Sequence, residues 1–174
     1  DENRKPILGT EEYIPCDTLL LSVGLIPENE LSSKLGVSMA PVTSGPAVNE
    51  SLETSISGVF ACGNVLHVHD LVDFVSQEAA LAGENAAAYV KSGKTGGEGR
   101  EVPLLAQDGV RYTVPQVLNV DTMEDTVTVR FRVADVYKDR YIAVYYDDKL
   151  ISRKKRKVLA PGEMEQVMLK KSSF

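Results

Sequence analysis

The sequence predicts an α/β segment followed by a small all-β, sandwich-like module. Three observations predict this fold class: two short apolar runs that end at glycine, one long stretch of helical period, and apolar–polar alternation after residue 125. Short apolar runs between helices are typical of α/β folds, whereas alternation is typical of half-buried antiparallel strands. Residues 92–100 are rich in glycine and indicate a linker, so we expect one unit at 1–91 and another at 101–174.

Two short strands are expected in the first unit. Residues 18–23 form an apolar run that stops at Gly24, and residues 58–63 form a second run that ends at Gly63. The length of these runs and their glycine stops favour buried strands. Residues 37–57 contain two prolines and a glycine, so we expect mostly loop between the two strands.

Two helices are expected in the same unit. Residues 28–35 suit a short helix that Gly36 stops. Residues 71–90 suit a longer helix, with Asp70 as its N-cap and Asp73 adding negative charge in the first turn. The packed face of this longer helix is expected to consist of Val75, Ala79, Ala82, Ala86 and Val90.

The second unit is expected to consist of short antiparallel strands. In residues 126–133, apolar side chains alternate with Thr126, Thr128, Arg130 and Arg132, which predicts one buried and one solvated face. Further strands are expected at 111–114, 116–120, 141–146, 149–151 and 164–169, with turns at Asp147-Asp148 and Pro161-Gly162. This pattern resembles a small immunoglobulin-like sandwich.

Charge and cysteine content exclude several classes of protein. The net charge is −6; residues 1–90 hold 13 acidic and three basic side chains, and residues 91–174 hold 12 acidic and 16 basic ones. The second half is too weakly basic to require a nucleic-acid partner. No apolar run approaches the ~18 residues of a membrane span. Cys16 and Cys62 cannot form a disulfide framework, so we expect a cytoplasmic protein with two structural thiols.

Two motifs carry the functional signal. Residues 54–64 read TSISGVFACGN, and residues 17–29 read DTLLLSVGLIPEN. Residues 54–64 resemble the second of the two flavin-binding motifs of the FAD-dependent pyridine nucleotide-disulfide oxidoreductases. Residues 17–29 resemble another conserved segment of that family, in which a strand ends at a glycine and is followed by a proline and an asparagine. Over about residues 12–91, the resemblance implies a Rossmann-like flavoprotein with two dinucleotide-binding domains.

The resemblance also implies a set of cofactor-binding residues. Gly63, Asn64 and Val65 would line the ribityl end of FAD, where a glycine lets backbone approach a ligand closely. Asp70, Leu71 and Val72 would supply backbone near the flavin ring, where a helix N-terminus stabilises negative charge. The family further implies that NAD or NADP serves as co-substrate.

The sequence departs from the family in two places. Asn64 stands where the family has aspartate, and neither G-x-G-x-x-G loop of the family is present. Because of the missing loops and the absence of an initiator Met, we expect the C-terminal part of a longer oxidoreductase. Its partners would be the N-terminal FAD and NAD(P) domains of the same polypeptide, with an oligomer or a redox partner subunit as a further option. Alone, this part should be inactive.

The expected position of the chain within this family rests on motifs that the chain lacks and on one short sequence segment. Disulfide reduction is disfavoured, because the chain has no C-x-x-C and no histidine after residue 100. Residues 65–75 resemble flavoproteins related to sarcosine oxidase and opine oxidase subunits.

Several residues allow other interpretations. His67, His69 and Asp70 could bind a metal ion, but histidines two apart face the same way only on an extended segment, so a hydrogen-bonded or flavin-orienting role is preferred. The cations of residues 153–157 are expected on a solvated strand edge, with docking against the acidic first half or a partner subunit as the option. The alternative function is a non-enzymatic interaction module built on the β unit.

Overall fold

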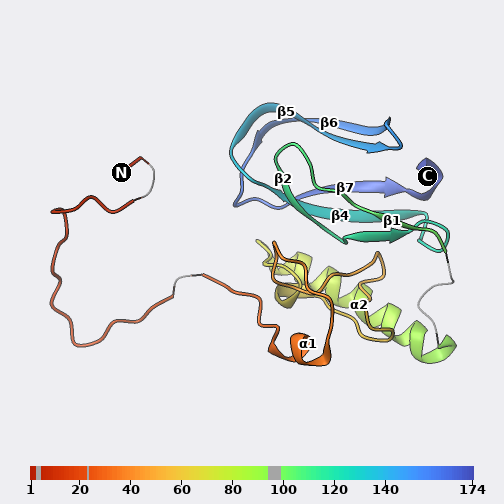
Figure 1. Ribbon diagram of the computed structural model, residues 1–174, viewed down its shortest axis with the longest axis horizontal. Helices are drawn as coiled ribbons and strands as arrows, with labels where there is room; N and C mark the ends of the chain where they lie inside the picture. Colours follow the sequence, from red (N-terminus) through yellow and green to blue (C-terminus); the bar gives the residue numbers. More distant parts are fainter. Residues whose placement is uncertain (3–4, 23, 94–98) are drawn as a thin grey trace.

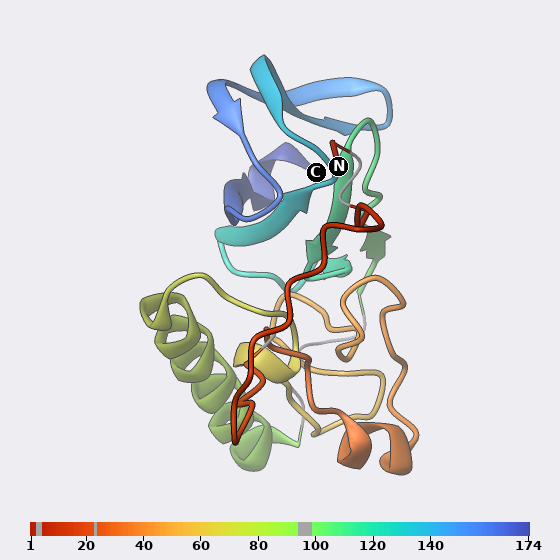
Figure 2. The same ribbon diagram turned by 90° about the vertical axis from the view of Figure 1, so that its left-hand side faces the viewer.

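The computed structural model describes residues 1–2, 5–22, 24–93 and 99–174. Figure 1 shows three stacked layers, with a two-stranded hairpin outermost, other strands in the middle and helix α2 on the opposite side. Viewed from the side in Figure 2, both α-helices lie on one side of all the strands. No helix among the described residues is long and apolar enough to cross a membrane.

Up to residue 28, the described residues (1–2, 5–22 and 24–28) run away from the rest of the molecule as irregular segments (Figure 1). The predicted strand at 18–23 is therefore wrong over residues 18–22, and Val23 lies outside the described residues. Leu20 is 89% exposed. A buried strand needs hydrogen-bonded neighbours, and the described residues offer none to this segment. Cys16 is also exposed, which corrects its expected structural role as a buried thiol.

The loops that follow are held by isolated bridges rather than by a sheet. Helix α1 spans Glu30–Leu35 and ends at Gly36, which adopts the left-handed conformation with φ 85°, as predicted. Residues 37–57 are mostly loop, as predicted. The predicted strand at 58–63 is wrong, because only Phe60 forms a bridge, to Glu53, and the short helix η1 (Gly63–Val65) begins at its end.

Helix α2 spans Val72–Ser92 and confirms the long helix. Asp73 lies in its first turn, as predicted. Its packed face differs from the expected one, because Ala79 is exposed and Val90 is 83% exposed. The buried residues of α2 are Glu78 and Ala82, so a carboxylate takes the centre of the face.

Among its described residues, 99–174, the second half contains seven strands in three small sheets. They are β1 (Glu101–Pro103), β2 (Val110–Val114), β3 (Val117–Asn119), β4 (Thr126–Val133), β5 (Tyr137–Tyr146), β6 (Lys149–Leu159) and β7 (Glu165–Lys170), followed by the short helix η2 (Lys171–Ser173). All pairs are antiparallel, in the orders β1-β3, β2-β4-β7 and β5-β6. The β-rich half is confirmed, as three sheets rather than a simple sandwich, and β1 was not predicted.

The β5–β6 hairpin carries the basic run. Its turn at Asp147-Asp148 is confirmed, and both residues have positive φ, 46° and 63°, as two-residue hairpin turns require. Arg153, Lys154, Lys155 and Lys157 are exposed on β6, as predicted. Arg156 is half-buried instead, because its guanidinium binds the Glu165 carboxylate at 2.5 Å.

Strand β4 lies between two layers, and both of its faces are covered. Val127, Val129, Phe131 and Val133 are buried and pack toward the hairpin. Val144 and Ile151 belong to the cluster of the first two, and Ile142 and Leu159 to the cluster of the last two. The opposite face was predicted to be solvated. This prediction is wrong for the two arginines, because Arg130 is buried and Arg132 is half-buried where β4 faces the first half of the chain.

The two halves meet in a shared cluster of buried side chains. Val114 of β2 packs with Val48, Leu52, Ala61, Leu66 and Ala82 from the first half. The Gln116 backbone N–H donates to the Val48 carbonyl at 3.0 Å, and the Val48 N–H donates to the Gln116 side chain at 2.8 Å. Residues 94–98 of the predicted linker lie outside the described residues, so the boundary at 92–100 stays a prediction.

Candidate functional site

The predicted cofactor residues lie in the turn before α2. Gly63 opens η1 with φ 69°, a conformation that favours glycine. A Cβ atom there would lie 3.2 Å from Cγ1 of Val75, so helix α2 packs closely against this turn. The Gly63 N–H donates to Oε2 of Glu78 at 3.0 Å. The turn is thus fixed from behind by the helix that follows it.

Asn64 and Val65 lie on the exposed side of the turn. The Asn64 Oδ1 atom accepts a hydrogen bond from the His69 backbone N–H at 3.1 Å, which closes the loop over residues 64–69. The Val65 carbonyl accepts one from Asn29 Nδ2 at 2.6 Å. Within the described residues, Nδ2 of Asn64 makes no hydrogen bond. An exposed amide donor therefore stands beside Gly63.

The N-terminus of α2 completes the predicted set. Leu71 precedes the helix and Val72 begins it, and these side chains are 54% and 74% exposed. Neither Leu71 nor any other described side chain caps the first turn. The first backbone N–H groups of a helix lack partners inside the helix, so the start of α2 presents donors for an electron-rich ligand.

Asp70 has a different role from the N-cap that the sequence predicts. Leu71 takes the N-cap position, in an extended conformation. The Asp70 carboxylate forms an ion pair with Arg132 of β4 and accepts the Met164 backbone N–H at 2.6 Å. The side chain therefore ties the start of the helix to the β-rich half.

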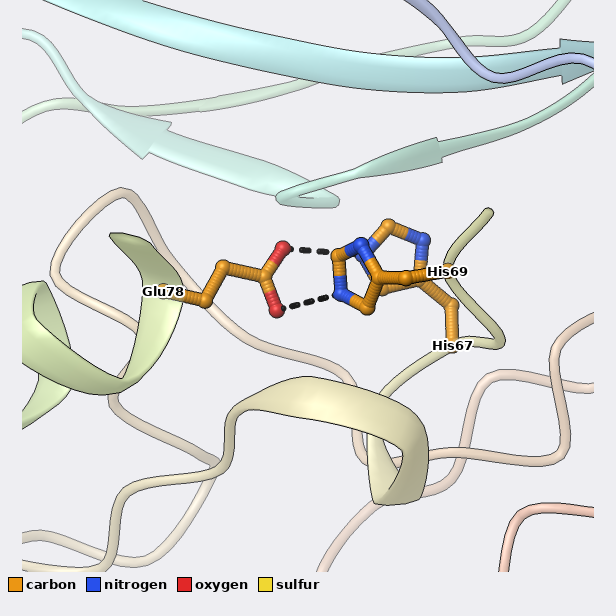
Figure 3. A group of neighbouring side chains, drawn as sticks. All are labelled: His67, His69 and Glu78. Atoms are coloured by element: carbon orange, nitrogen blue, oxygen red, sulfur yellow. Dashed lines mark hydrogen bonds and ion pairs between the residues drawn. The ribbon is translucent and has the colours of Figure 1, made fainter. Parts of the chain in front are cut away.

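Behind the turn, His67, His69 and Glu78 form a buried cluster (Figure 3). Nε2 of His67 lies 2.9 Å from Oε1 of Glu78, and Nε2 of His69 lies 2.9 Å from Oε2. Arg130 of β4 adds a contact from NH1 to Oε1 at 3.3 Å. With the Gly63 N–H, the Glu78 carboxylate has four partners, which is what a buried charge requires.

Burial and hydrogen bonding have opposite effects on the pKa values of this cluster. Burial raises the pKa of the Glu78 carboxyl, but the hydrogen bonds and charges of His67 and His69 lower that pKa to about 2. Burial lowers the pKa of the His67 imidazole, although Glu78 favours its protonation. At neutral pH, the cluster therefore holds an ionised Glu78 beside a neutral His67.

The same cluster presents two histidines and a carboxylate, a set of metal-ligand types. One ligand atom from each of His67, His69 and Glu78 lies within 4.8 Å of the others. Glu78 thus takes the place that the sequence gave to Asp70. However, metal-ligating histidines usually donate their second ring N–H to an acceptor, and within the described residues both Nδ1 atoms are buried without a partner. Arg130 already balances the Glu78 charge, so we interpret the cluster as a hydrogen-bonded one.

Sequence reasoning missed Glu78 and assigned Arg130 and Arg132 to the wrong environment. One signal was available for Glu78, which lies three residues after Val75 and four before Ala82, and so on the predicted packed face. A carboxylate on such a face needs buried cations or donors. The two arginines alternate with buried apolar residues, a pattern that does not distinguish solvent from a polar neighbouring layer.

Comparison with known proteins identifies the first half of the chain. The family model described as pyridine nucleotide-disulphide oxidoreductase matches residues 1–86, about half of the chain. Residues 1–86 belong to this family. The family assigns a Rossmann-like FAD/NAD(P)-binding segment to this part of the chain, which confirms the predicted resemblance.

The similarity to one curated protein supports the same family. The ferredoxin–NADP reductase of Ignicoccus hospitalis is 29% identical to the chain over 86 residues, which cover 49% of the chain and 28% of the relative. The chain therefore spans less than a third of the reductase that it matches. The search of solved structures found no significant match.

The family implies the use of a flavin, and residues 63–72 offer hydrogen-bond donors to such a ligand. The backbone at Gly63 carries no side chain, Nδ2 of Asn64 is an unused donor among the described residues, and the first N–H groups of α2 lack a side-chain cap. The Asn64 amide and the first N–H groups of α2 are donors, and they match the oxygens of a ribityl chain and a flavin ring.

Proposed function

We propose that the full-length protein is an oxidoreductase that exchanges a hydride between NAD(P)H and FAD. We further propose that residues 63–65 and 70–72 form the ribityl and ring side of its FAD site. The membership of residues 1–86 in the pyridine nucleotide-disulphide oxidoreductases carries the reaction class. The relative's name, ferredoxin–NADP reductase, supports a pyridine nucleotide as one substrate.

Each residue has a defined role in this proposal. When bound, FAD supplies the ring that accepts and releases hydride. Gly63 lets the backbone approach the ribityl chain, and Nδ2 of Asn64 donates a hydrogen bond to it. The N–H groups at the start of α2 donate to the ring oxygens, where negative charge increases on reduction. The bound cofactor would thereby link NAD(P)H to a second substrate or redox partner.

Asparagine at position 64 is compatible with this role. The Oδ1 atom already holds the loop through the His69 N–H, so the Nδ2 atom is the part that faces a ligand. Aspartate, the usual family residue, would keep the loop contact but would place a negative charge beside the phosphates of FAD. The narrower similarity to sarcosine and opine oxidase subunits stays a prediction.

The FAD affinity of the full-length protein tests the site. Asn64→Leu should weaken FAD binding by about fivefold, because one hydrogen bond to the ligand contributes on the order of 1 kcal/mol. Gln107→Leu, a matched amide-to-leucine change on an exposed loop, should leave the affinity unchanged. Isothermal titration of the FAD-free protein measures both. Equal affinity in the two variants would exclude Asn64 from the FAD site.

A further inference from the structure

Two arginines of β4 reach across to the segment that we assign to FAD. Arg130 and Arg132 are two positions apart on one strand, so their side chains leave the same face of the sheet. This face is turned toward α2 (Figure 1). Both side chains are largely enclosed, with 11% and 12% of their surfaces exposed. The β-rich half therefore places two cations against the start of the helix.

Arg130 is bound to the buried helix face. NH1 lies 3.3 Å from Oε1 of Glu78, NH2 donates to Oε1 of Gln77 at 3.1 Å, and the guanidinium lies 5.4 Å from the centre of the Phe74 ring. All three partners belong to the first two turns of α2. Arg130 thus neutralises the carboxylate that also holds the Gly63 N–H.

Arg132 is bound to the loop that enters the helix. NH2 donates to the Val68 carbonyl at 2.9 Å and forms the ion pair with Asp70. NH1 donates to the Pro161 carbonyl at 3.2 Å, in the turn between β6 and β7. The Met164 N–H of the same turn donates to Asp70 at 2.6 Å. The loop entering α2 is therefore held by strand β4 and by the turn between β6 and β7.

We propose that Arg130 and Arg132 are positioning residues for the FAD site, so that the β-rich half holds the turn at Gly63 and the start of α2 in the conformation that binds the cofactor. This inference rests on the proposed function. Arg130 acts through Glu78, whose two oxygens connect it to Gly63, His67 and His69. Arg132 acts through Asp70 and the Val68 carbonyl.

Removing the Arg130 charge should change the midpoint potential of the bound flavin, whereas a simple loss of packing should not. Replacing Arg130 by glutamine leaves the Glu78 carboxylate buried without its cation, next to the turn proposed to contact FAD. An added negative charge near the flavin stabilises its oxidised form more than its reduced, more negative form. The midpoint potential of the bound flavin should therefore fall. A variant that only loosens the fold would lose FAD without this shift.

The test uses the full-length protein and four single variants. Arg130→Gln and Arg132→Gln remove the two cations, and Arg130→Lys restores a charge at the first position. Arg140→Gln is the matched control, because Arg140 is exposed on β5. Strand β5 lies in the outer hairpin, on the opposite side of the molecule from α2 (Figure 1). FAD affinity, the potential of the bound flavin and the melting temperature are measured for each.

The proposal predicts that both glutamine variants bind FAD about tenfold more weakly. In addition, Arg130→Gln should lower the flavin potential, Arg130→Lys should recover most of both properties, and Arg140→Gln should match the wild type. Wild-type affinity and potential in Arg130→Gln and Arg132→Gln would overturn the inference while leaving the proposed function intact. A wild-type protein that binds no FAD would instead overturn the proposed function.

Discussion

At the scale of single residues, Glu78 is the centre of the molecule's polar interior. Its carboxylate joins the turn at Gly63, the two histidines and a cation from β4. If the carboxylate were removed, the Gly63 N–H and the Nε2 atoms of both histidines would lose the partner described for them, and Arg130 would keep only Gln77 as a side-chain acceptor. Buried unpaired groups are costly. Glu78→Leu should therefore be far more disruptive than its position on a helix suggests.

The same residue predicts how stability depends on pH. The folded pKa of Glu78, about 2, lies below its ordinary value of 4.5, so its contribution is present above pH 4.5 and is lost as pH falls toward 2. Burial also lowers the pKa of His67 from 6.5, so the unfolded state takes up a proton first as pH falls below 6.5. Both effects make the free energy of unfolding fall with decreasing pH.

Urea unfolding of the chain between pH 8 and pH 4 measures this dependence. In His67→Gln, the part of the decrease that begins near pH 6.5 should be smaller than in the wild type. A free energy of unfolding that stays constant or rises from pH 7 to pH 4 would contradict the assignment of Glu78 and His67 as a buried ionised–neutral pair.

At the scale of elements, the helices follow from the sequence better than the strands do. Helix α2 agrees with the predicted 71–90 within two residues at its C-terminal end, because the helical spacing of its residues is a local signal. The predicted strand fails over residues 18–22 because an isolated apolar run forms a strand only when neighbouring strands are present.

Strand β4 also shows that a local sequence pattern does not reveal the neighbours of an element in the fold. Its alternation predicted the strand and its buried apolar face, which Val129 and Phe131 confirm. The pattern could not show that the polar face packs against a helix, since arginines facing solvent and arginines facing Glu78 look alike in sequence. The candidate FAD residues came from a motif, whereas the residues that hold the motif came only from the structure.

Two glycines of neighbouring elements offer a matched stability test. Gly63→Ala should destabilise the fold by about 1–2 kcal/mol, because φ is 69° and the new Cβ would lie 3.2 Å from Val75. Gly83→Ala should stabilise it by roughly 0.5–1 kcal/mol, because Gly83 lies within α2 with no atom within 4 Å of a new Cβ. Thermal unfolding compares them, and similar effects in both would contradict the described geometry of the turn.

At the scale of the whole molecule, the two halves are joined by apolar packing and by hydrogen bonds. Val114 enters the apolar cluster of the first half, Gln116 exchanges hydrogen bonds with Val48, and the Asn119 N–H donates to Glu50 at 2.8 Å. Together with the arginines of β4, these contacts make the β-rich half a support for the family segment. Deleting residues 101–174 should therefore disturb the turn at 63–72.

The most direct test of the central claim is the absorbance spectrum of the full-length protein during anaerobic addition of NADH and, separately, NADPH. We expect the bands of bound oxidised flavin, and their bleaching by one of the two nucleotides at about one equivalent. A protein that shows no flavin bands and gains none after incubation with FAD would contradict the assignment of residues 63–72 to a flavin site.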